Sequence, residues 1–503
     1  MPSAELRARD DDAAGAPDKT DVVVAVKNAA TLGASLVATW SVALLVRFYL
    51  PRHLGPERFG AFSFADGFAA ASFVVLGLGV ETYIQKEIPV RPRHASDFFG
   101  GFVLLRLAMS VAVFAAMAAL LHLTGRPPAI QRAVFVFGVA QILAAQNGNM
   151  AALLHAARTV GGLAIVNVGT KLLWGACVAL ALYLDLDLLG LALAFVVSET
   201  ARAVLLFAFV RRHLGIRLTW DARAVRAVVV ASLPFYLNQV AITAYAKVDV
   251  SLLAVLSNDA EVGWYGSASN LAALSFLVSP LVGWVLLPLL SRAAARSPEE
   301  MLSILRWTLR AIVVLMLPLT LIIGLGADYW VPLLFGEAFT PALTSLRILA
   351  PVLVVTYLAM LAATCLTLLG RAWTVTFISI GGLAGNLALN ALLAPRALAW
   401  LGPGGAGAGA AAALVTAEIV MTAALFAAIG ARAFDRASVK SIAGAIASAA
   451  LVTAVDAALR PLGAARFAVD AVVYAGLHLA FGVVSTSDVA RARGLVRALR
   501  SPR

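Results

Sequence analysis

The chain has 503 residues, of which 61% are hydrophobic and only 13% are charged. Charged residues make up about 25% of an ordinary soluble protein, so this composition excludes a soluble enzyme or binding domain. The net charge of +12 would favour nucleic acid as the partner of a soluble domain, but the distribution of the cations described below gives a different explanation, and we expect no nucleic-acid partner.

Apolar runs long enough to cross a bilayer follow one another along nearly the whole chain. A spanning helix needs about 20 mostly apolar residues, and polar, proline and glycine breaks divide the chain into about 14 such runs. The first six are expected near residues 28–50, 60–83, 98–123, 131–155, 159–184 and 187–210. The next six are expected near 227–256, 262–290, 302–326, 343–369, 370–394 and 404–430, and the last two near 438–459 and 463–485. The sequence therefore predicts an all-α polytopic membrane protein.

The runs group into two six-helix lobes followed by two extra helices. Residues 1–27 are polar and lack an apolar segment with a cleavage site, so we interpret them as a disordered cytoplasmic tail rather than a signal peptide. The expected organisation is that tail, an N-lobe over 28–210, a basic cytoplasmic linker over 211–226, a C-lobe over 227–430, and the last two helices with a basic cytoplasmic tail over 431–503.

The basic residues concentrate on one side of the predicted helices. Counting Lys and Arg in alternate tails and loops gives about 24 on one side and about 7 on the other, and the richer side is the cytoplasmic one. The loops at 185–190 and 257–263 on the poorer side contain no basic residue. This pattern predicts a multi-pass protein with both termini in the cytoplasm.

The loops leave no room for a catalytic domain. No predicted loop exceeds about 20 residues, which is too short to form a separate soluble domain. Asp185 and Asp187 have the D-x-D spacing of some glycosyltransferases, but they lie in a very short turn at a helix boundary. No nucleotide-binding glycine-rich loop occurs, and the two cysteines and six histidines show no metal-binding spacing. We therefore expect no enzyme activity, no cofactor and no metal site.

An internal repeat relates the two lobes. Residues 59–75 (FGAFSFADGFAAASFVV) align with residues 262–278 (VGWYGSASNLAALSFLV), so that Gly60 meets Gly263. The offset spans six predicted helices, and an even number of crossings keeps the same topology. This is the pattern of a parallel repeat about an axis along the membrane normal, as in transporters that bind their cargo between two halves.

Three cations, Arg106, Lys171 and Lys247, fall near the middle of predicted spans. A charge that faces lipid at this depth costs roughly 3 kcal/mol or more, so each side chain should face water or a partner inside the bundle. We interpret them as substrate-binding groups of a cationic cavity, and a buried structural ion pair is the alternative.

Arg47 and Arg202 are second choices for the same cavity. Arg47 lies near a helix end, from which its side chain can reach the interface. Arg202 follows Glu199 by three residues on one helix face, so a local ion pair explains it equally well.

The predicted helix 227–256 carries both Lys247 and Asp249. Because the two residues are two positions apart, they point in different directions and do not simply neutralise each other. Pro234 removes a backbone hydrogen bond from the same helix and permits a bend. A bendable helix with two polar stripes suits the lining of a pathway that changes shape.

Asp249 and Glu81 are the candidates for ion coupling. Asp249 is central in its span, and Glu81 is near the cytoplasmic end of the second helix. A buried carboxylate can load and release a proton, whereas an acid paired with a resident Lys or Arg stays ionised, which is the alternative for both.

Several motifs resemble those of bacterial polysaccharide flippases in the same chain order. Residues 49–88 resemble the first helical hairpin of these proteins. Residues 232–271 resemble the start of their second half, where a proline–aromatic pair, a Val–Asp dipeptide and a VGxY turn recur. Shorter matches follow at 333–351 (LLFGEAFTPALTSLRILAP), 366–373 (LTLLGRAW) and 385–395 (GNLALNALLAP). The sequence thus resembles the O-antigen, Wzx-type flippase family of the multidrug/oligosaccharidyl-lipid/polysaccharide exporter superfamily.

The resemblance implies a fold of 14 helices in two lobes that open a central cavity alternately to each side of the bacterial inner membrane. The implied cargo is an undecaprenyl-diphosphate-linked oligosaccharide for surface polysaccharide biosynthesis. Membrane lipid, a polysaccharide polymerase and chain-length machinery are the implied partners. Asp249 matches the Asp of the family's Val/Ile–Asp position, which implies a role in ion coupling. A proton- or sodium-coupled multidrug antiporter and a non-transporting scaffold of envelope assembly are the alternatives.

Overall fold

The computed structural model describes residues 19–88, 95–156, 160–215, 221–274 and 279–481. All regular secondary structure in these ranges is helical, which confirms the predicted all-α class. The first elements are α2 (Lys19–Phe73), η1 (Val74–Gly77), α3 (Val80–Glu87), α4 (Ala95–Leu123), α5 (Pro128–Ala156), α6 (Val160–Tyr183), α7 (Leu188–Leu214) and α8 (Ala222–Leu256). They are followed by α9 (Asp259–Ala272), α10 (Ser279–Arg296), α11 (Pro298–Leu325), α12 (Ala327–Phe335), η4 (Glu337–Phe339), α13 (Ala342–Leu349) and α14 (Val352–Leu368). The last elements are α15 (Ala372–Leu401), α16 (Gly405–Ile429), η5 (Ala431–Ala433), α17 (Arg436–Leu459), η6 (Arg460–Ala465) and α18 (Arg466–Ala480).

Ten helical stretches within these ranges are long and apolar enough to cross a membrane. Two of them, Ala34–Gly77 and Arg436–Ala480, have 44 and 45 residues, which is enough for two crossings each. Each contains one glycine with a non-helical backbone, Gly55 and Gly463. The first is therefore two spans joined at a sharp bend, as the sequence predicts for 28–50 and 60–83. The predicted helix 262–290 is instead divided between α9 and α10.

The described helices belong to two compact units. The first unit contains the chain up to Val46, Leu76–Ala116 and Phe135–Tyr236. Its apolar core is formed by α3, α4, α5, α6, α7 and α8, and Phe98 and Phe102 of α4 are almost completely buried in it. The second unit contains Arg47–Val75, Met117–Val134 and the chain from Leu237 onward.

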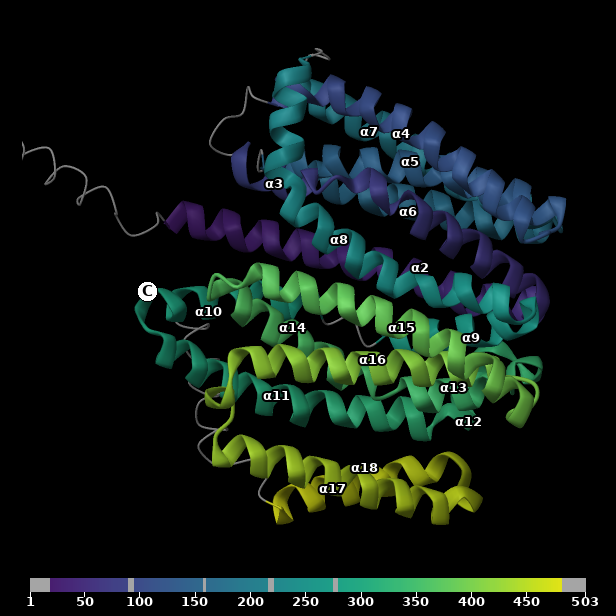
Figure 1. Ribbon diagram of the computed structural model, residues 1–503, viewed down its shortest axis with the longest axis vertical. Coiled ribbons are helices and arrows are strands. Elements are labelled where there is room, and N and C mark those ends of the chain that lie inside the picture. Colours follow the sequence, from purple (N-terminus) through teal and green to yellow (C-terminus); the bar gives the residue numbers. More distant parts are fainter. Residues whose placement is uncertain (1–18, 89–94, 157–159, 216–220, 275–278, 482–503) are drawn as a thin grey trace, which may run out of the picture. The chain divides into compact units, whose positions relative to one another are not determined.

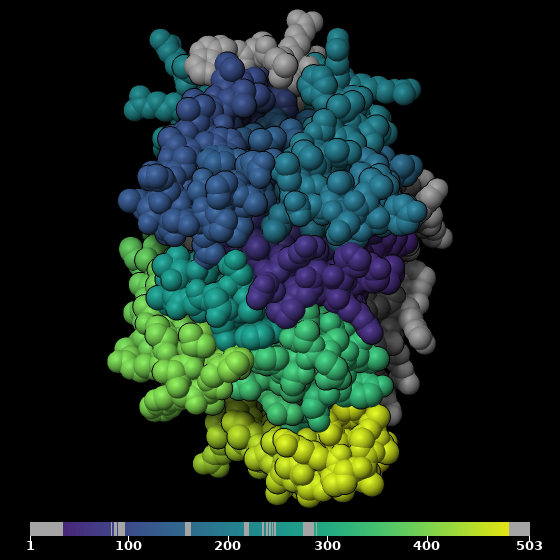
Figure 2. All heavy atoms as spheres, turned by 90° about the vertical axis from the view of Figure 1, so that its right-hand side faces the viewer, coloured from purple at the N-terminus to yellow at the C-terminus, as the bar shows by residue number. Residues whose placement is uncertain are grey.

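The core of the second unit lies among α10, α11, α14 and α16. Tyr357 and Cys365 of α14 are fully buried there. Helix α15 runs along α16, and α14 contacts both (Figure 1). Helices α17 and α18 pack together, and α17 lies against α11. Figure 2 shows the side chains of this C-terminal helix pair (yellow) in contact with the preceding helices of the same unit (green).

Residues that the internal repeat aligns meet one another in the second unit. A Cβ atom at Gly60 would collide with the backbone of Asp259 and Gly263, and a Cβ at Gly263 would collide with the backbone of Pro56 and Gly60. Reciprocal contacts of this kind arise where a symmetry axis passes between two equivalent elements. The second half of α2 and α9 therefore approach each other backbone to backbone at these two glycines, and only glycine permits so close an approach.

The local sequence explains where several helices begin and end. Ser297 accepts a hydrogen bond from the backbone N–H of Glu300 at the start of α11, with Pro298 as its first residue, which is a common N-terminal signal. Helix α7 ends at Gly215 in a left-handed conformation after a basic last turn, which satisfies the terminal carbonyls and complements the helix dipole. Parts of the predicted tails and linker, at 1–18, 216–220 and 482–503, lie outside the described residues.

Candidate functional site

A polar pocket in the middle of the first unit contains two of the predicted cations, Lys171 and Arg202. Its volume is about 260 Å³. Helices α2, α6 and α7 form its walls. The lining residues are Ser35, Leu36, Thr39, Asn167, Thr170, Lys171, Trp174, Phe195, Ser198, Glu199 and Arg202. The structure thus brings one first-choice and one second-choice cation into the same cavity, at mid-helix depth.

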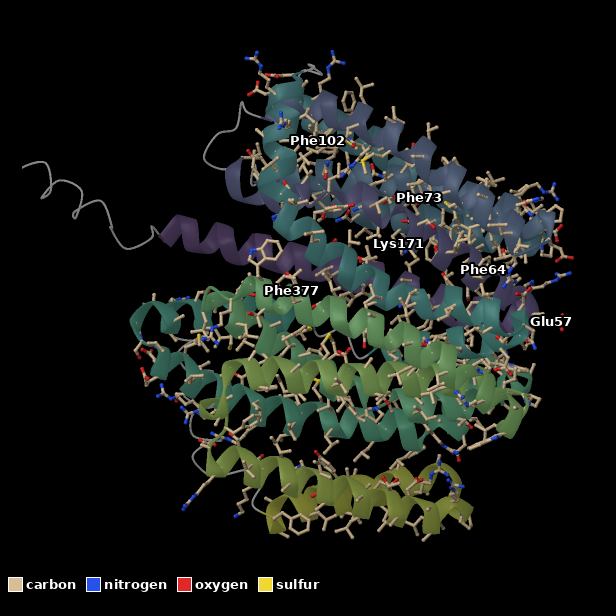
Figure 3. All side chains as sticks on the ribbon, in the orientation of Figure 1. Glu57, Phe64, Phe73, Phe102, Lys171 and Phe377 are labelled. Carbon is tan, nitrogen blue, oxygen red and sulfur yellow. The ribbon has the colours of Figure 1, made fainter. Side chains whose placement is uncertain are left out.

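The charged groups of the pocket are held in defined positions. The Nζ atom of Lys171 (labelled in Figure 3) lies 3.6 Å from the centroid of the Trp174 ring, a favourable cation–π distance. Arg202 Nη2 donates to Asn167 Oδ1 at 3.2 Å, and its Nη1 lies 3.9 Å from Glu199 Oε2. The local pair between Arg202 and Glu199 that the sequence offers is therefore present, but it is long.

Two buried N–H donors of this pocket have no acceptor among the described residues. They are Arg202 Nε and the indole Nε1 of Trp174. A buried donor without an acceptor costs about 1–3 kcal/mol. The acid in the pocket, Glu199, already accepts a hydrogen bond at 2.7 Å from Asn147 Nδ2. The pocket therefore offers free donor capacity beside two cations, an arrangement that fits a ligand rich in acceptor oxygens.

Arg106 has a different environment in the same unit. Its side chain is only 2% exposed, and it donates to five protein oxygens. The acceptors are Leu76 O, Gly77 O, Ala145 O, Gln146 Oε1 and Asn149 Oδ1, at 2.8–3.3 Å.

The interruption of the helix before α3 explains why Arg106 forms these hydrogen bonds. Leu78 and Gly79 have positive φ angles of 53° and 65°, so the preceding helical turn ends and leaves carbonyl groups without intrahelical donors. Arg106 supplies those donors and joins this turn to α5. It does not line the pocket, and in this conformation its role is structural.

Glu81, a candidate for ion coupling, lies close to Arg106. Its carboxylate is close enough to interact electrostatically with Arg106. Its Oε1 occupies the space that a Cβ at Gly148 of α5 would take. Glu81 therefore has a resident cation nearby, which corresponds to the alternative interpretation of this acid.

Arg47 and Lys247 are the remaining predicted cations. Arg47 is exposed on α2 and is assigned to the second unit, and it is not among the residues that line the pocket of the first unit. Lys247 lies on α8, and its side chain is outside the described residues. The substrate-binding role predicted for these two residues stays a prediction.

Asp249 is the centre of a buried polar cluster in the second unit. It is 4% exposed. Its carboxylate accepts hydrogen bonds from Tyr265 Oη at 3.0 Å, Asn386 Nδ2 at 2.6 Å and Asn390 Nδ2 at 3.0 Å. The amide oxygens of both asparagines are buried and have no donor among the described residues. A carboxylate beside two unsatisfied amide oxygens is a set of hard oxygen ligands that suits a small cation or a proton.

The two asparagines are the functional candidates that the sequence analysis missed. Asn386 and Asn390 are four residues apart on α15, and both are fully buried. Two amides one turn apart in an apolar helix were the available signal, because they share one face and must find polar partners in the bundle. Trp174 was also missed, and its only signal was its position three residues after Lys171.

A model of the family described as polysaccharide biosynthesis protein matches residues 25–294. This match spans more than half of the chain. The chain belongs to this family. Among proteins of curated function, no sequence matches this chain.

Solved structures with the same fold include multidrug transporters and a lipid II flippase. The lipid II flippase MurJ in an inward closed conformation has a TM-score of 0.71 at 12% identity, covering 92% of this chain and 100% of MurJ. An inward-facing multidrug resistance MATE family transporter of the MOP superfamily has a TM-score of 0.63 at 17% identity, covering 79% and 98%. A variant of the Vibrio cholerae MATE transporter VcmN has a TM-score of 0.56 at 16% identity, covering 82% and 99%. At these identities the likeness establishes the fold of the chain, which is that of an all-α multi-pass membrane protein.

Proposed function

We propose that this protein is a flippase that moves an undecaprenyl-diphosphate-linked oligosaccharide across the bacterial inner membrane for surface polysaccharide biosynthesis. The observation that carries the proposal is the pocket of the first unit, in which Lys171 and Arg202 accompany two N–H donors without acceptors. The family's part in polysaccharide biosynthesis and the fold shared with a lipid II flippase support the same conclusion.

The chemistry of the cargo explains why such a pocket is needed. A diphosphate cannot enter hydrocarbon without losing its hydration, and charge-assisted hydrogen bonds from cations replace part of that hydration. Guanidinium and ammonium groups serve this purpose. A guanidinium group can donate two parallel hydrogen bonds to a phosphate, and an ammonium group attracts it as a point charge. Ser35, Thr39 and Ser198 of the pocket wall add hydroxyl groups of the kind that bind phosphate or sugar oxygens. The apolar tail of the lipid stays in the bilayer throughout.

Ion coupling at Asp249 forms the second part of the proposal. Net transport of cargo in one direction needs an energy source, and a cation that moves down its electrochemical gradient through the same conformational cycle supplies it. Asp249 with the free amide oxygens of Asn386 and Asn390 is our proposed site for the coupling Na⁺ or proton. Glu81 is a weaker candidate because Arg106 is close to it.

A multidrug antiporter is the alternative, and the MATE-like fold and the buried Asp249 favour it. Cationic drugs require an acidic or aromatic pocket, and Lys171 and Arg202 would repel them. The same alternating-access fold therefore serves the flippase proposal better in this chain. A non-transporting scaffold would not need donors that lack acceptors inside a cavity.

Reconstitution tests the proposal directly. The purified protein is placed in vesicles with a labelled undecaprenyl-diphosphate oligosaccharide, and a membrane-impermeant glycosidase measures how fast the sugar becomes accessible. We expect the double variant Lys171→Gln with Arg202→Gln to slow flipping by about 100-fold, since each lost charge-assisted contact is worth about 1.5–3 kcal/mol.

The matched control is Arg212→Gln, which removes an exposed cation at the end of α7 outside the pocket. We expect it to flip at the wild-type rate. If the protected sugar stays inaccessible in vesicles that contain the wild-type protein, the flipping proposal is refuted. A double variant as fast as the control would remove the pocket from the mechanism.

A further inference from the structure

Helix α7 carries an acid and a base that stay apart although their spacing favours a close pair. Glu199 and Arg202 are three residues apart, and residues at this spacing are neighbours on one helix face, where opposite charges attract each other. A close charge-assisted pair places nitrogen and oxygen about 2.7–2.9 Å apart. Arg202 Nη1 instead lies 3.9 Å from Glu199 Oε2, which is beyond hydrogen-bond distance. Other partners therefore hold the two side chains.

Asn147 of α5 holds the acid. Its side chain is completely buried, and its Nδ2 donates to Glu199 Oε2 at 2.7 Å and to the backbone oxygen of Glu199 at 2.9 Å. Both contacted atoms are acceptors, so the amide has to present its nitrogen to them, because the reversed amide would place its own oxygen against both. Two contacts from a neighbouring helix thus fix the orientation of this carboxylate.

Asn167 of α6 holds the cation. Arg202 Nη2 donates to Asn167 Oδ1 at 3.2 Å. The side chain of Arg202 is 28% exposed, and its Nε has no acceptor among the described residues. Each charge of the pair therefore bonds to a neutral amide from another helix. The guanidinium keeps hydrogen-bonding capacity that a close pair with Glu199 would use.

This separation matters for a pocket that binds an anion. A guanidinium in close contact with a carboxylate has its charge compensated and its paired donors occupied. An incoming phosphate would then have to displace the acid of the same helix turn. The apparent affinity of a site falls in proportion to the fraction of molecules in the binding-competent arrangement. Holding Glu199 away from Arg202 raises that fraction.

We propose that Asn147 is a positioning residue of the headgroup pocket, which keeps Arg202 available for the diphosphate by holding the carboxylate of Glu199. The inference rests on the proposed function of the pocket. Asn147 is not among the residues that line the pocket, so it acts through Glu199 rather than on the cargo.

The neighbours of Asn147 on α5 have a different task. Gln146 and Asn149 accept hydrogen bonds from Arg106 at 3.1 and 3.2 Å. One turn of α5, residues 146–149, therefore supports two arginines in opposite ways. It uses the donors of Arg106 for the fold, and through Asn147 it spares those of Arg202.

Flipping kinetics of Asn147→Leu test the proposal. The leucine has a similar volume but no donor, so the buried carboxylate of Glu199 turns to Arg202 as the nearest donor. We expect about a 10-fold rise in the cargo concentration that gives half-maximal flipping, with the maximal rate nearly unchanged. Adding Glu199→Gln to Asn147→Leu removes the competing charge and should restore the wild-type value. Asn147→Ala, which removes the same donor without adding bulk, should behave like Asn147→Leu.

Chemical labelling tests the same inference without any cargo. Phenylglyoxal modifies accessible guanidinium groups, and mass spectrometry of the purified protein measures its rate at Arg202, with the exposed Arg212 of the same helix as reference. Labelling of Arg202 should slow in Asn147→Leu and recover when Glu199→Gln is added.

The outcomes separate this inference from the proposed function. A wild-type protein that does not flip its cargo would refute the proposed function, and the labelling rates would still decide the role of Asn147. An unchanged labelling rate of Arg202 in Asn147→Leu would overturn the inference. So would a double variant as impaired as Asn147→Leu, because Asn147 would then only support the packing of α5 on α7.

Discussion

The two candidate sites, one in each unit, leave opposite kinds of hydrogen-bonding groups unsatisfied. In the pocket of the first unit the free groups are donors, Arg202 Nε and Trp174 Nε1. In the Asp249 cluster of the second unit they are acceptors, the amide oxygens of Asn386 and Asn390. Free donors beside cations suit an anion, and free acceptors beside a carboxylate suit a cation. The contrast supports a division of labour in which one unit binds the headgroup and the other binds the coupling ion.

The same contrast separates Arg106, whose donors are all used within the protein, from Arg202, which we propose binds the cargo. Arg106 gives its donors to five protein oxygens, whereas Arg202 keeps one donor free. Depth in the membrane is the same kind of signal for both, so depth alone does not identify a binding residue. What distinguishes them is how many acceptors the surrounding backbone provides.

The largest effect should follow from Arg106→Met. The substitution leaves buried carbonyl groups at the break before α3 without donors, and losing one partner of a buried charge network costs about 3–5 kcal/mol. We expect a strongly reduced yield of folded protein and a lower thermal midpoint in detergent. Arg202→Met, in the same unit, is the control and should fold nearly as well as wild type. If Arg106→Met folds normally and fails only in flipping, Arg106 belongs to the cargo site after all.

A smaller but more specific effect is expected for Asp249→Asn. The asparagine keeps the shape of the cluster and removes its charge, so the protein should fold but lose the stimulation of flipping by an imposed Na⁺ or proton gradient. A coupling free energy of about 1–3 kcal/mol corresponds to a roughly 5- to 150-fold change. Vesicles with and without each gradient measure it.

Glu261→Gln is the matched control for Asp249→Asn. Glu261 is also buried in the second unit, but its oxygens accept the backbone N–H groups of Gly404 and Gly407 at 2.6 and 3.1 Å. It therefore caps the start of α16, and its neutralisation should change stability without removing the gradient dependence. Equal gradient dependence in Asp249→Asn and wild type would place the coupling ion elsewhere.

The helical architecture was predictable because the lipid bilayer requires it. Backbone N–H and C=O groups in a bilayer must form hydrogen bonds within each segment, so a spanning helix can be recognised by the length and hydropathy of its apolar run. The predicted helix at 438–459 is α17, Arg436–Leu459. The break that divides 262–290 was not predicted, because the run remains apolar across it.

The partners of the buried charges were less accessible to sequence reasoning. Asn386 and Asn390 lie 137 and 141 residues from Asp249, and only the packing of α15 against α8 brings them together. The acceptors of Arg106 include backbone carbonyls, which no side-chain pattern reveals. Lys171 and Arg202 share a pocket because the faces of α6 and α7 that carry them pack together. The sequence predicts how deep each residue lies in its span, but it does not predict which helix faces pack together.

The smallest effect should come from a charge outside the spans, that of Asp435. Asp435 lies before α17, where its Oδ1 accepts a hydrogen bond at 2.7 Å from the backbone N–H of Ser438 and lies 3.4 Å from Arg310 Nη1. Partial burial raises the pKa of Asp435, but the Ser438 hydrogen bonds and the nearby arginines outweigh burial and leave this pKa below its usual value. A carboxyl with a lowered pKa stabilises the folded state above its unfolded pKa of about 3.9, and this contribution is lost as the pH falls.

Asp435→Asn preserves the capping acceptor and removes the charge, so the loss of stability at neutral pH should be below about 1 kcal/mol for this solvent-screened pair. The difference from wild type should disappear in acid, where the carboxylate of Asp435 is protonated. Melting curves of Asp435→Asn and the wild type over one pH series measure this contribution of the ionised cap. A destabilisation of the variant that is equal at every pH would mean that the charge of Asp435 does not contribute.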